Sequence, residues 1–153
     1  MIEFTKVKLP YGWMGNMSPF PIIYDSKRWL TTEALFQAMR FSNEEIKELI
    51  RAQKSPMAAK MIAKSKKVNY VIEPMSEKDV ENMRLCMRLK LEQHPNLKTQ
   101  LLATGNHYIF ENIGTRNKPN DLFWGAKMLN GELVGNNMMG KIWMEFRERL
   151  RGV

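Results

Sequence analysis

The sequence predicts a mainly α-helical α+β fold with small β-hairpins, and three observations lead to this prediction. Capping residues stand ahead of most of the apolar, periodic stretches. In the longest of these stretches the apolar residues recur every three or four positions, as on the buried side of a helix. The segments that favour extended structure are short. With 153 residues, 44% of them hydrophobic and 26% charged, we expect one compact domain over residues 1–153.

The first elements are marked by a turn and a cap. The turn signal at Asp25-Ser26 predicts a short hairpin over residues 19–30. Threonine at position 31 or 32 can cap the next helix, which we expect to end near Phe41. Glu33 then lies in the first turn, where the helix dipole favours a carboxylate.

The next three elements are each identified by their opening residues. They are a helix from the capping-box pattern Ser42-x-x-Glu45 to about Gln53, a helix opened by Ser55-Pro56 that ends among residues 65–67, and a β-branched, extended segment over residues 68–74.

The longest predicted helix runs from Ser76-x-x-Asp79 to about Gln93. Arg84 and Arg88 lie one turn apart on one of its faces. Its buried stripe comprises Val80, Met83, Met87 and Leu91.

The C-terminal third is expected to alternate between short elements and a long loop. The elements are a helix from about Pro95 to Thr104 stopped by Gly105, a strand over residues 108–111, an irregular stretch over residues 113–136, and a final helix over residues 138–149 that buries Met139, Ile142, Trp143, Phe146 and Leu150.

Composition narrows the function classes. The net charge of +8 favours a polyanionic or phosphate-bearing partner, although the densest run, Lys64-Ser-Lys66-Lys67, also fits a solvated loop. A single cysteine, Cys86, excludes an internal disulfide and a cysteine-based zinc site, and two histidines make a metal site unexpected. No apolar run is long enough for a membrane span and no secretory signal is visible, so we expect a cytoplasmic protein.

Glu33 is the main catalytic candidate. As a residue of the first helical turn, it also fits a purely stabilising role. Phe36 and Gln37 follow at three and four positions, so a carboxylate, a ring and an amide share one helix face close to Trp29. This combination favours a pocket over a solvated surface.

A second group of candidates follows in the C-terminal third. Asp121 precedes Trp124-Gly125, where it also fits a turn, and Trp124 also fits a core position. Glu111 ends the predicted strand. Asn137 is a candidate N-cap of the last helix, whose free N–H groups can hold a phosphate or a ribose hydroxyl.

Other enzyme classes lack their motifs. The sequence has no GxxxxGK[ST], no GxGxxG after a strand, no GxSxG and no HExxH. Kinase, Rossmann oxidoreductase, serine hydrolase and zinc protease functions therefore have no support.

Ten short motifs follow one another along the chain. They are Gly15-Asn16-Met17, Trp29, Thr32-Glu33, Phe36-Gln37-Ala38, Ser55-Pro56-Met57-Ala58, Met83-x-x-x-Met87-x-x-Lys90-Leu91, Ala103-Thr104-Gly105, Glu111, Asp121-x-x-Trp124-Gly125 and Asn137-x-x-Gly140-x-x-x-Met144-x-x-Arg147. In this order they resemble the NADAR, or YbiA-like, family from about residue 11 to 150, with Gly15-Asn16-Met17 standing where Ser-Asn-Phe is usual. Three departures border the expected pocket: Ala34 where the family often has His, Met75 where it often has Trp, and Ala126-Lys127 where small and acidic residues are common.

The resemblance implies hydrolysis of an N-glycosidic bond without metal or cofactor. Relatives act either on ADP-ribosylated guanine in nucleic acid or on phosphorylated riboflavin-pathway intermediates, and we favour the first substrate for this basic chain. A non-catalytic module that binds ADP-ribose or nucleic acid is the remaining alternative. No membrane and no obligate protein partner is expected.

The resemblance also implies roles for individual residues. Glu33 would be the principal carboxylate, and Asp121 would hold the ribose hydroxyls or assist proton transfer. The expected substrate-binding residues are Asn16, Phe36, Gln37, Glu111, Trp124, Gly125 and Asn137, with Trp124 stacking on a flat group and Glu111 supporting the loop. Arg84 and Arg88 would contribute to a face that contacts nucleic-acid phosphates.

Overall fold

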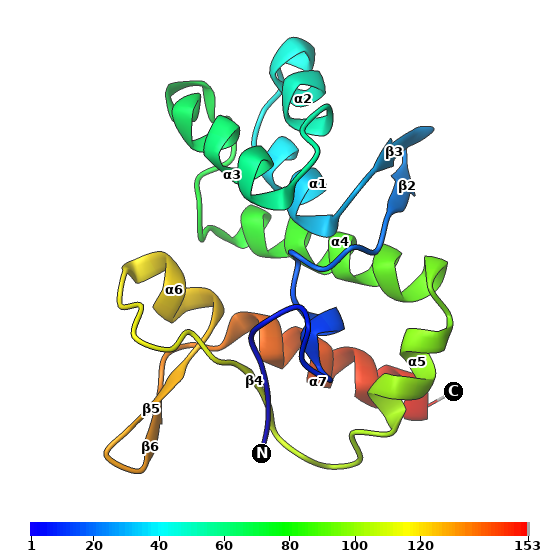
Figure 1. The fold of residues 1–153 in the computed structure, drawn as a ribbon, viewed down its shortest axis with the longest axis vertical. Helices are drawn as coiled ribbons and strands as arrows, with labels where there is room; N and C mark the ends of the chain where they lie inside the picture. The colour runs from blue at the N-terminus through cyan, green and yellow to red at the C-terminus, as the bar shows by residue number, and fades with distance from the viewer. Residues whose placement is uncertain (153) are drawn as a thin grey trace. The chain divides into compact units, whose positions relative to one another are not determined.

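The computed structural model describes residues 1–152, which form two compact units. One unit comprises residues 16–94, and the other comprises residues 1–15 with the chain from residue 95 onward. Within the described residues, seven α-helices accompany six strands of three residues each (Figure 1). The predicted mainly helical α+β class is confirmed, and the single domain over residues 1–153 stays a prediction.

The unit of residues 16–94 combines one hairpin with four α-helices. The hairpin is antiparallel, and Asp25 and Ser26 in its turn both have positive φ, as a tight two-residue turn requires. The predicted hairpin is therefore confirmed. The elements are β2 (Ile22–Tyr24), β3 (Lys27–Trp29), α1 (Thr32–Ala38), α2 (Glu44–Arg51), α3 (Pro56–Ser65), the 3-10 turn η2 (Lys67–Asn69) and α4 (Glu77–Gln93).

Three of the four helix starts in this unit were predicted correctly. Thr31 accepts a hydrogen bond from an N–H of α1, Ser55 does the same for α3 and Ser76 for α4. The prediction for α2 was wrong by one residue, because the side chain of Asn43, not of Ser42, accepts the N–H of Ile46. Helix α1 also ends earlier than expected, at Ala38.

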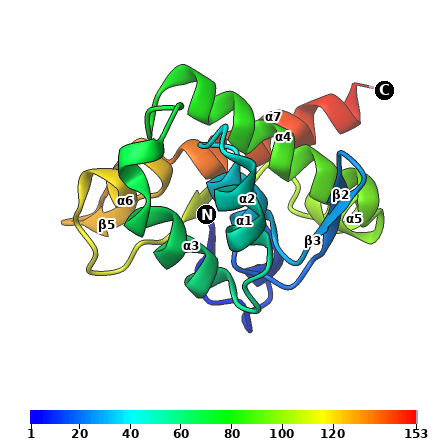
Figure 2. The same cartoon turned by 90° about the horizontal axis from the view of Figure 1, so that it is seen from above.

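Helix α1 is the centre of this unit, where it packs against α2, α3 and α4 (Figures 1 and 2). Ala59 and Ala63 are fully buried, and their small side chains let α3 approach its neighbours closely. The four apolar residues predicted as the stripe of α4 are all buried. Cys86 is also buried, and burial raises the pKa of its thiol.

The expected extended segment over residues 68–74 is absent. Residues of this stretch form η2 and an irregular connection, and Val68 is almost fully exposed. The N–H groups of Val71 and Ile72 donate to the carbonyl of Arg40 at 2.8 and 3.3 Å. The segment therefore satisfies its backbone without a partner strand, so its β-branched composition was misleading.

The other unit is built around the last helix. Trp143 of this helix is fully buried and donates its indole N–H to the carbonyl of Met14 at 3.0 Å. The first strand pairs in parallel with β4, and Ile2 lies opposite Ile109. The elements are β1 (Ile2–Phe4), the 3-10 turn η1 (Gly12–Met14), α5 (Asn96–Leu102), β4 (Ile109–Glu111), α6 (Pro119–Trp124), β5 (Lys127–Leu129), β6 (Glu132–Val134) and α7 (Met138–Arg151).

The long loop expected over residues 113–136 was wrong. This stretch contains α6 and the antiparallel β5–β6 hairpin. The hairpin turns at Asn130-Gly131, where both residues have positive φ. An Asn-Gly pair between short apolar segments is a strong hairpin signal, so the information was present in the sequence.

Smaller differences concern the last elements. Helix α5 is shorter than expected at both ends, and α7 continues to Arg151. Leu150 is only half-buried, whereas the other four residues expected in the core of α7 are buried. None of the helices over residues 1–152 is both long and apolar enough to cross a membrane.

Candidate active site

Glu33 lies in the first turn of α1, at its second residue, and is almost entirely buried, with 7% of its surface exposed. Its backbone N–H donates to the carbonyl of Asn16 at 3.2 Å, which fixes the start of the helix. Burial raises the pKa of the Glu33 carboxyl above its ordinary value, because the charged form loses its hydration. A carboxyl with a raised pKa in a folded interior is typical of acid–base sites.

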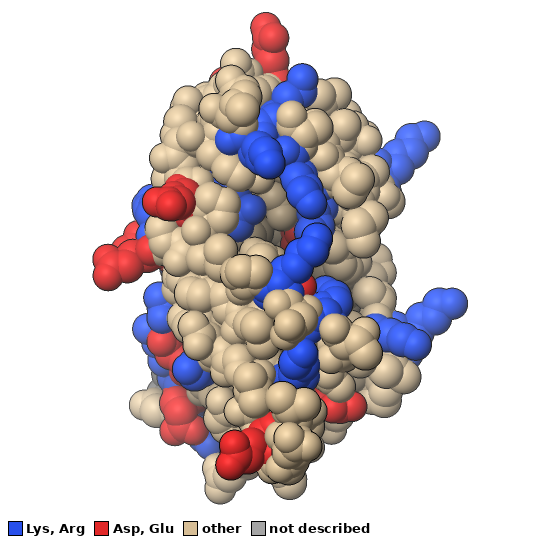
Figure 3. Space-filling view, turned by 90° about the vertical axis from the view of Figure 1, so that its left-hand side faces the viewer, with Lys and Arg blue, Asp and Glu red and all other residues tan. Residues whose placement is uncertain are grey.

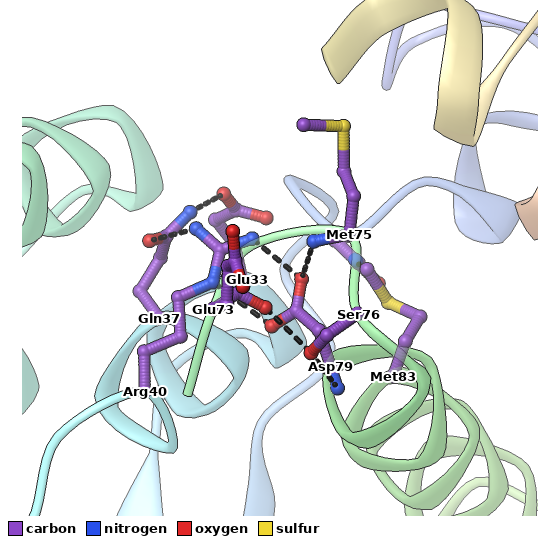
Figure 4. Close-up of polar contacts among 9 residues, drawn as sticks. Glu33, Gln37, Arg40, Glu73, Met75, Ser76, Asp79 and Met83 are labelled. Carbon is purple, nitrogen blue, oxygen red and sulfur yellow. Dashed lines mark hydrogen bonds and ion pairs between the residues drawn. The ribbon is translucent and has the colours of Figure 1, made fainter. Parts of the chain in front are cut away.

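Gln37 holds the Glu33 carboxylate. Its amide Nε2 donates to Glu33 Oε1 at 3.0 Å, across one helical turn (Figure 4). The proximity predicted from their four-residue spacing is present in the structure. Among the described residues, the bond from Gln37 is the one hydrogen bond to the Glu33 carboxylate, and it goes to Oε1. This bond stabilises the charged form and lowers the pKa, against the effect of burial.

A buried ion pair that the sequence did not suggest orients Gln37 in turn. Arg40 Nε and Nη2 donate to the two carboxylate oxygens of Asp79 at 2.9 and 2.8 Å. Arg40 Nη1 also contacts Gln37 Oε1 at 3.4 Å, so a continuous chain of polar contacts links Asp79 to Glu33 (Figure 4). The guanidinium stacks over the ring of Phe36, 4.7 Å from its centroid.

Asp79 also shapes the chain just before α4. Its Oδ2 accepts the N–H of Met75 at 2.8 Å, and Met75 has a φ of 66°. Ser76 caps the helix through the N–H of Asp79 at 3.3 Å. The sequence marked Asp79 only as part of this cap, and the ion pair with Arg40 joins residues 39 positions apart.

Charges near Glu33 act in both directions. Lys60 on α3 and Arg40 lower the pKa of its carboxyl, after the larger effect of the Gln37 hydrogen bond. Asp79 raises this pKa. The local cations therefore favour ionisation of a carboxyl that burial disfavours, and such opposing influences suit a group that gains and loses a proton.

Asn16 makes two side-chain hydrogen bonds near the start of α1. Its Oδ1 accepts the hydroxyl of Thr32 at 2.9 Å, and its Nδ2 donates to the sulfur of Met83 at 3.0 Å. Ala34 lies where His is common in the family that the sequence resembles. It is buried and has no polar side-chain atom. The departure therefore removes a possible donor and acceptor next to Glu33.

A fully buried lysine, which the sequence did not single out as a candidate, lies on α4 in the same unit. Lys90 Nζ donates to Ser18 Oγ at 3.0 Å and lies 5.5 Å from the ring centroid of Phe20. Burial lowers the pKa of Lys90 to about 7, because the ammonium form is poorly hydrated there.

In the unit that contains α7, Asn137 joins β4 to the start of this helix. Its Oδ1 accepts the N–H of Glu111 at 3.1 Å and its Nδ2 donates to the carbonyl of Ile109 at 2.9 Å. The predicted N-cap position is confirmed: Asn137 is the N-cap of α7, with a φ of 51°, although its side chain makes no cap hydrogen bond. The amide is used instead to fix the end of β4.

Gly125 lies where no side chain fits. A Cβ atom there would be 2.8 Å from the carbonyl oxygen of Glu111 and 2.5 Å from Ile113 Cγ2. It would also be 3.2 Å from Glu111 Oε1, so the Glu111 carboxylate lies against this glycine. Trp124 is buried beside it and meets the ring of Phe123 edge-on at 4.9 Å.

Asp121 serves the first turn of α6. Its Oδ2 accepts the N–H of Lys118 at 3.3 Å, and its Oδ1 lies 3.5 Å from Arg116 Nη1. These contacts stabilise the helix start, whereas the alternative interpretation placed Asp121 in a turn. They leave its predicted catalytic role a prediction.

The two arginines proposed for phosphate contact differ in their surroundings. Arg84 is half-buried, whereas Arg88 is exposed and forms an ion pair with Glu92 at 3.9 Å. An exposed pair of this kind is weak, so it does not prevent Arg88 from contacting a phosphate.

The described residues include no group of three or more His, Cys, Asp or Glu side chains placed to hold a metal ion. The structure assigns Asn16, Glu33, Phe36 and Gln37 to one unit. It assigns Glu111, Asp121, Trp124, Gly125 and Asn137 to the other.

Comparison with known proteins adds independent information. The sequence pattern of the NADAR domain matches residues 3–151. N-glycosidase YbiA of Escherichia coli (strain K12) is 36% identical over 152 residues, which cover 98% of this chain and 88% of the relative. N-glycosidase Npun_R5314 of Nostoc punctiforme is 30% identical over 155 residues, covering 99% and 94%.

A third relative is longer than this chain, and the fold is also similar to that of a solved structure. The riboflavin biosynthesis protein VVA0006 of Vibrio vulnificus is 29% identical over 155 residues, 98% of this chain but 38% of the relative. The NMR structure of the E. coli protein YbiA superimposes with a TM-score of 0.80 at 33% identity, covering 98% of this chain and 84% of that one.

Proposed function

Because the chain belongs to the NADAR domain family, we propose that it is an N-glycosidase, a hydrolase that cleaves the bond between C1 of a phosphorylated ribose and a base nitrogen. The relatives named N-glycosidase support this reaction class. The observation that carries the proposal is the buried Glu33 carboxylate, held at Oε1 by Gln37.

This carboxylate suits the chemistry of N-glycoside hydrolysis. As the C–N bond breaks, positive charge develops at C1 and the ring oxygen of the ribose. A buried anion stabilises this charge more strongly than a solvated one, because fewer water dipoles screen it. A water adds to C1, its proton passes to the carboxylate, and the base leaves with the bonding electron pair and takes up a proton. Glu33 Oε2 is the oxygen we expect to meet the water or C1.

Within this class we propose ADP-ribosylated guanine in nucleic acid as the substrate. The net charge of +8 supports a polyanionic substrate, since cations gain affinity for phosphates by releasing counterions. Both ADP-ribose and the strand that carries it are polyanions. The enzyme would then reverse an ADP-ribosylation of the base.

A phosphorylated intermediate of riboflavin biosynthesis is the second candidate. It is favoured by the similarity to VVA0006, whose name places that protein in riboflavin biosynthesis. Both candidate substrates present the same ribose C1 bonded to nitrogen, so the same carboxylate would serve either.

The experiment offers both substrates to the same enzyme. A guanine-ADP-ribosylated, single-stranded DNA oligonucleotide and a phosphorylated aminopyrimidine riboside are incubated separately with the wild type and Glu33→Gln. We expect ADP-ribose release from the oligonucleotide, and a loss of about 10²–10⁴-fold in rate with Glu33→Gln, the usual contribution of an acid–base group. Oligonucleotide affinity should stay close to that of the wild type.

Glu45→Gln is the matched control, because Glu45 is an exposed residue of α2 and its replacement changes the charge by the same amount. It should keep the wild-type rate. Cleavage of the riboside alone would replace the nucleic-acid substrate by the riboflavin intermediate. Binding of the oligonucleotide with no turnover of either compound would show a non-catalytic binding module instead.

A further inference from the structure

One stretch of the unit of residues 16–94 concentrates positive charge. Residues 49–72 contain six lysines or arginines and no aspartate or glutamate. The stretch covers the end of α2, all of α3 and η2. It is the longest segment of the sequence without an aspartate or glutamate.

Helix α3 directs part of this charge to one side. Met57, Lys60, Met61 and Lys64 are spaced by three and four positions and therefore lie on one helix face. The two methionines are 56% and 60% exposed. Ala59 and Ala63, on the opposite side, are buried, so the mixed lysine and methionine face is the solvent side of the helix. In the upper part of Figure 3, which views the side where α3 lies in Figure 1, lysine and arginine side chains form a row.

We define the lysine row as Lys54, Lys60, Lys64, Lys66 and Lys67. In the part of the chain that the structure describes, none of these lysines forms an ion pair. In the same unit, Lys27 and Arg51 are both paired with Glu48, at 2.6 and 2.7 Å. The row is thus a group of positive charges in this unit that is not held in ion pairs.

One member of the row, Lys60, lies near the candidate catalytic group. Helix α3 packs against α1, which carries Glu33. Lys60 lies close enough to Glu33 for its charge to lower the pKa of that carboxyl. A ligand that contacts Lys60 would therefore lie within electrostatic range of this carboxylate.

We propose that the lysine row and the exposed methionines of α3 form the surface that binds the sugar–phosphate backbone of a nucleic-acid strand next to Glu33. The inference rests on the proposed function for the choice of nucleic acid as the ligand. Binding of a strand to the lysine row does not require that the protein turns over a substrate. Ten residues of α3 span about 15 Å, which is long enough to follow several phosphates of one strand. The methionine side chains offer flexible apolar contacts to sugars and bases between the lysines.

A strand fits this surface better than a membrane does. Helices that lie on membranes bury an apolar face with large residues such as Trp, Phe and Leu. The exposed face of α3 has only two methionines among its lysines, and its other apolar face is already buried against the unit. The surface also differs from the one expected from the sequence, because it lies on α3, whereas Arg84 and Arg88 lie on α4.

The test is the salt dependence of binding. The affinity for a short, fluorescently labelled single-stranded DNA is measured by anisotropy at several salt concentrations between about 50 and 200 mM, with the wild type and with the triple variant Lys64→Gln, Lys66→Gln, Lys67→Gln. Lys60 is kept because it acts on Glu33. The slope of log K against log salt is negative, and each phosphate contact adds about 0.7 to its magnitude on a single strand. Loss of three contacts should therefore make the slope shallower by about 2.

A control variant has the same change in net charge elsewhere. Lys6→Gln, Lys8→Gln, Lys141→Gln replaces three exposed lysines of the other unit and should keep most of the wild-type slope. Circular dichroism and melting curves check that both variants are folded. An unchanged slope in the α3 variant, or an equal fall in both variants, would overturn the proposal.

Two further measurements separate the sources of failure. If the enzyme is active, the α3 variant should raise the KM for the ADP-ribosylated oligonucleotide while the KM for ADP-ribosylated guanosine, which has no backbone, stays unchanged. An equal rise for both would contradict a backbone surface. If no substrate is turned over, the proposed function fails while the salt slopes still decide this inference. Lysine-dependent binding to phosphatidylserine vesicles without binding to DNA would also overturn it.

Discussion

Replacement of Asp79 by asparagine tests whether the buried ion pair with Arg40 holds the site together. The Asp79 carboxylate is completely buried and accepts two hydrogen bonds from Arg40 and one from the N–H of Met75, all between 2.8 and 2.9 Å. Asparagine has nearly the same size, but it has one acceptor oxygen and an NH₂ group that would face another donor. Arg40 would then remain buried without its counter-charge.

The expected loss of stability is large for a single atom change. Removing one partner of a buried ion pair destabilises a protein by about 3–5 kcal/mol. That is a substantial part of the roughly 5–15 kcal/mol with which proteins of this kind resist unfolding. At about 2–4 °C per kcal/mol for a chain of this length, the melting temperature should fall by about 6–20 °C.

Urea unfolding followed by circular dichroism measures the change, and a double-mutant cycle isolates the pair. Arg40→Met combined with Asp79→Leu leaves no charge unpaired, so the double variant should lose less than the sum of the single variants. A loss below about 1 kcal/mol for Asp79→Asn, the value typical of exposed pairs, would refute the reasoning. Additivity in the cycle would refute it as well.

Two further predictions concern residues of the candidate site. Because the pKa of Glu33 is raised on folding, the native state binds this proton more tightly and the wild type loses stability as pH rises above the ordinary value of 4.5. Glu33→Gln should therefore be more stable than the wild type and the control Glu45→Gln at neutral pH. This gain in stability should vanish in acid, and urea unfolding at both pH values measures it. Asn137→Ala leaves the N–H of Glu111 and the carbonyl of Ile109 without their side-chain partner, so it should lower the free energy of unfolding by about 1–3 kcal/mol in the same assay. An unchanged urea midpoint would contradict this and would mean that water replaces the amide.

Local signals in the sequence predicted most of the helical fold. The caps at Thr31, Ser55 and Ser76 depend on contacts within three or four residues, so a local pattern contains all the information they need. Residues 68–74 show the opposite case. A strand forms only if another strand pairs with it, and no local property of a β-branched segment reveals whether such a partner exists.

The same distinction separates the parts of the candidate site. The contact between Glu33 and Gln37 follows from helical spacing, and it was predicted. The ion pair between Arg40 and Asp79 joins α1 to the start of α4, and it requires the packing of the unit. The residue types at the two positions did not predict the pair, because the sequence around Asp79 indicates only the capping pattern at the start of α4.

Amides were the residues most difficult to interpret from sequence, because a ligand and a peptide group demand the same donors and acceptors. Both ends of Asn137 bind backbone groups of β4, and both ends of Gln37 are engaged by Glu33 and Arg40. These side chains therefore orient their neighbours. Glu33 Oε2 is left as the oxygen of the buried carboxylate that Gln37 does not hold. If Glu33 acts on water or on C1, as proposed, the reaction should proceed at Oε2, with Oε1 fixing the direction of approach.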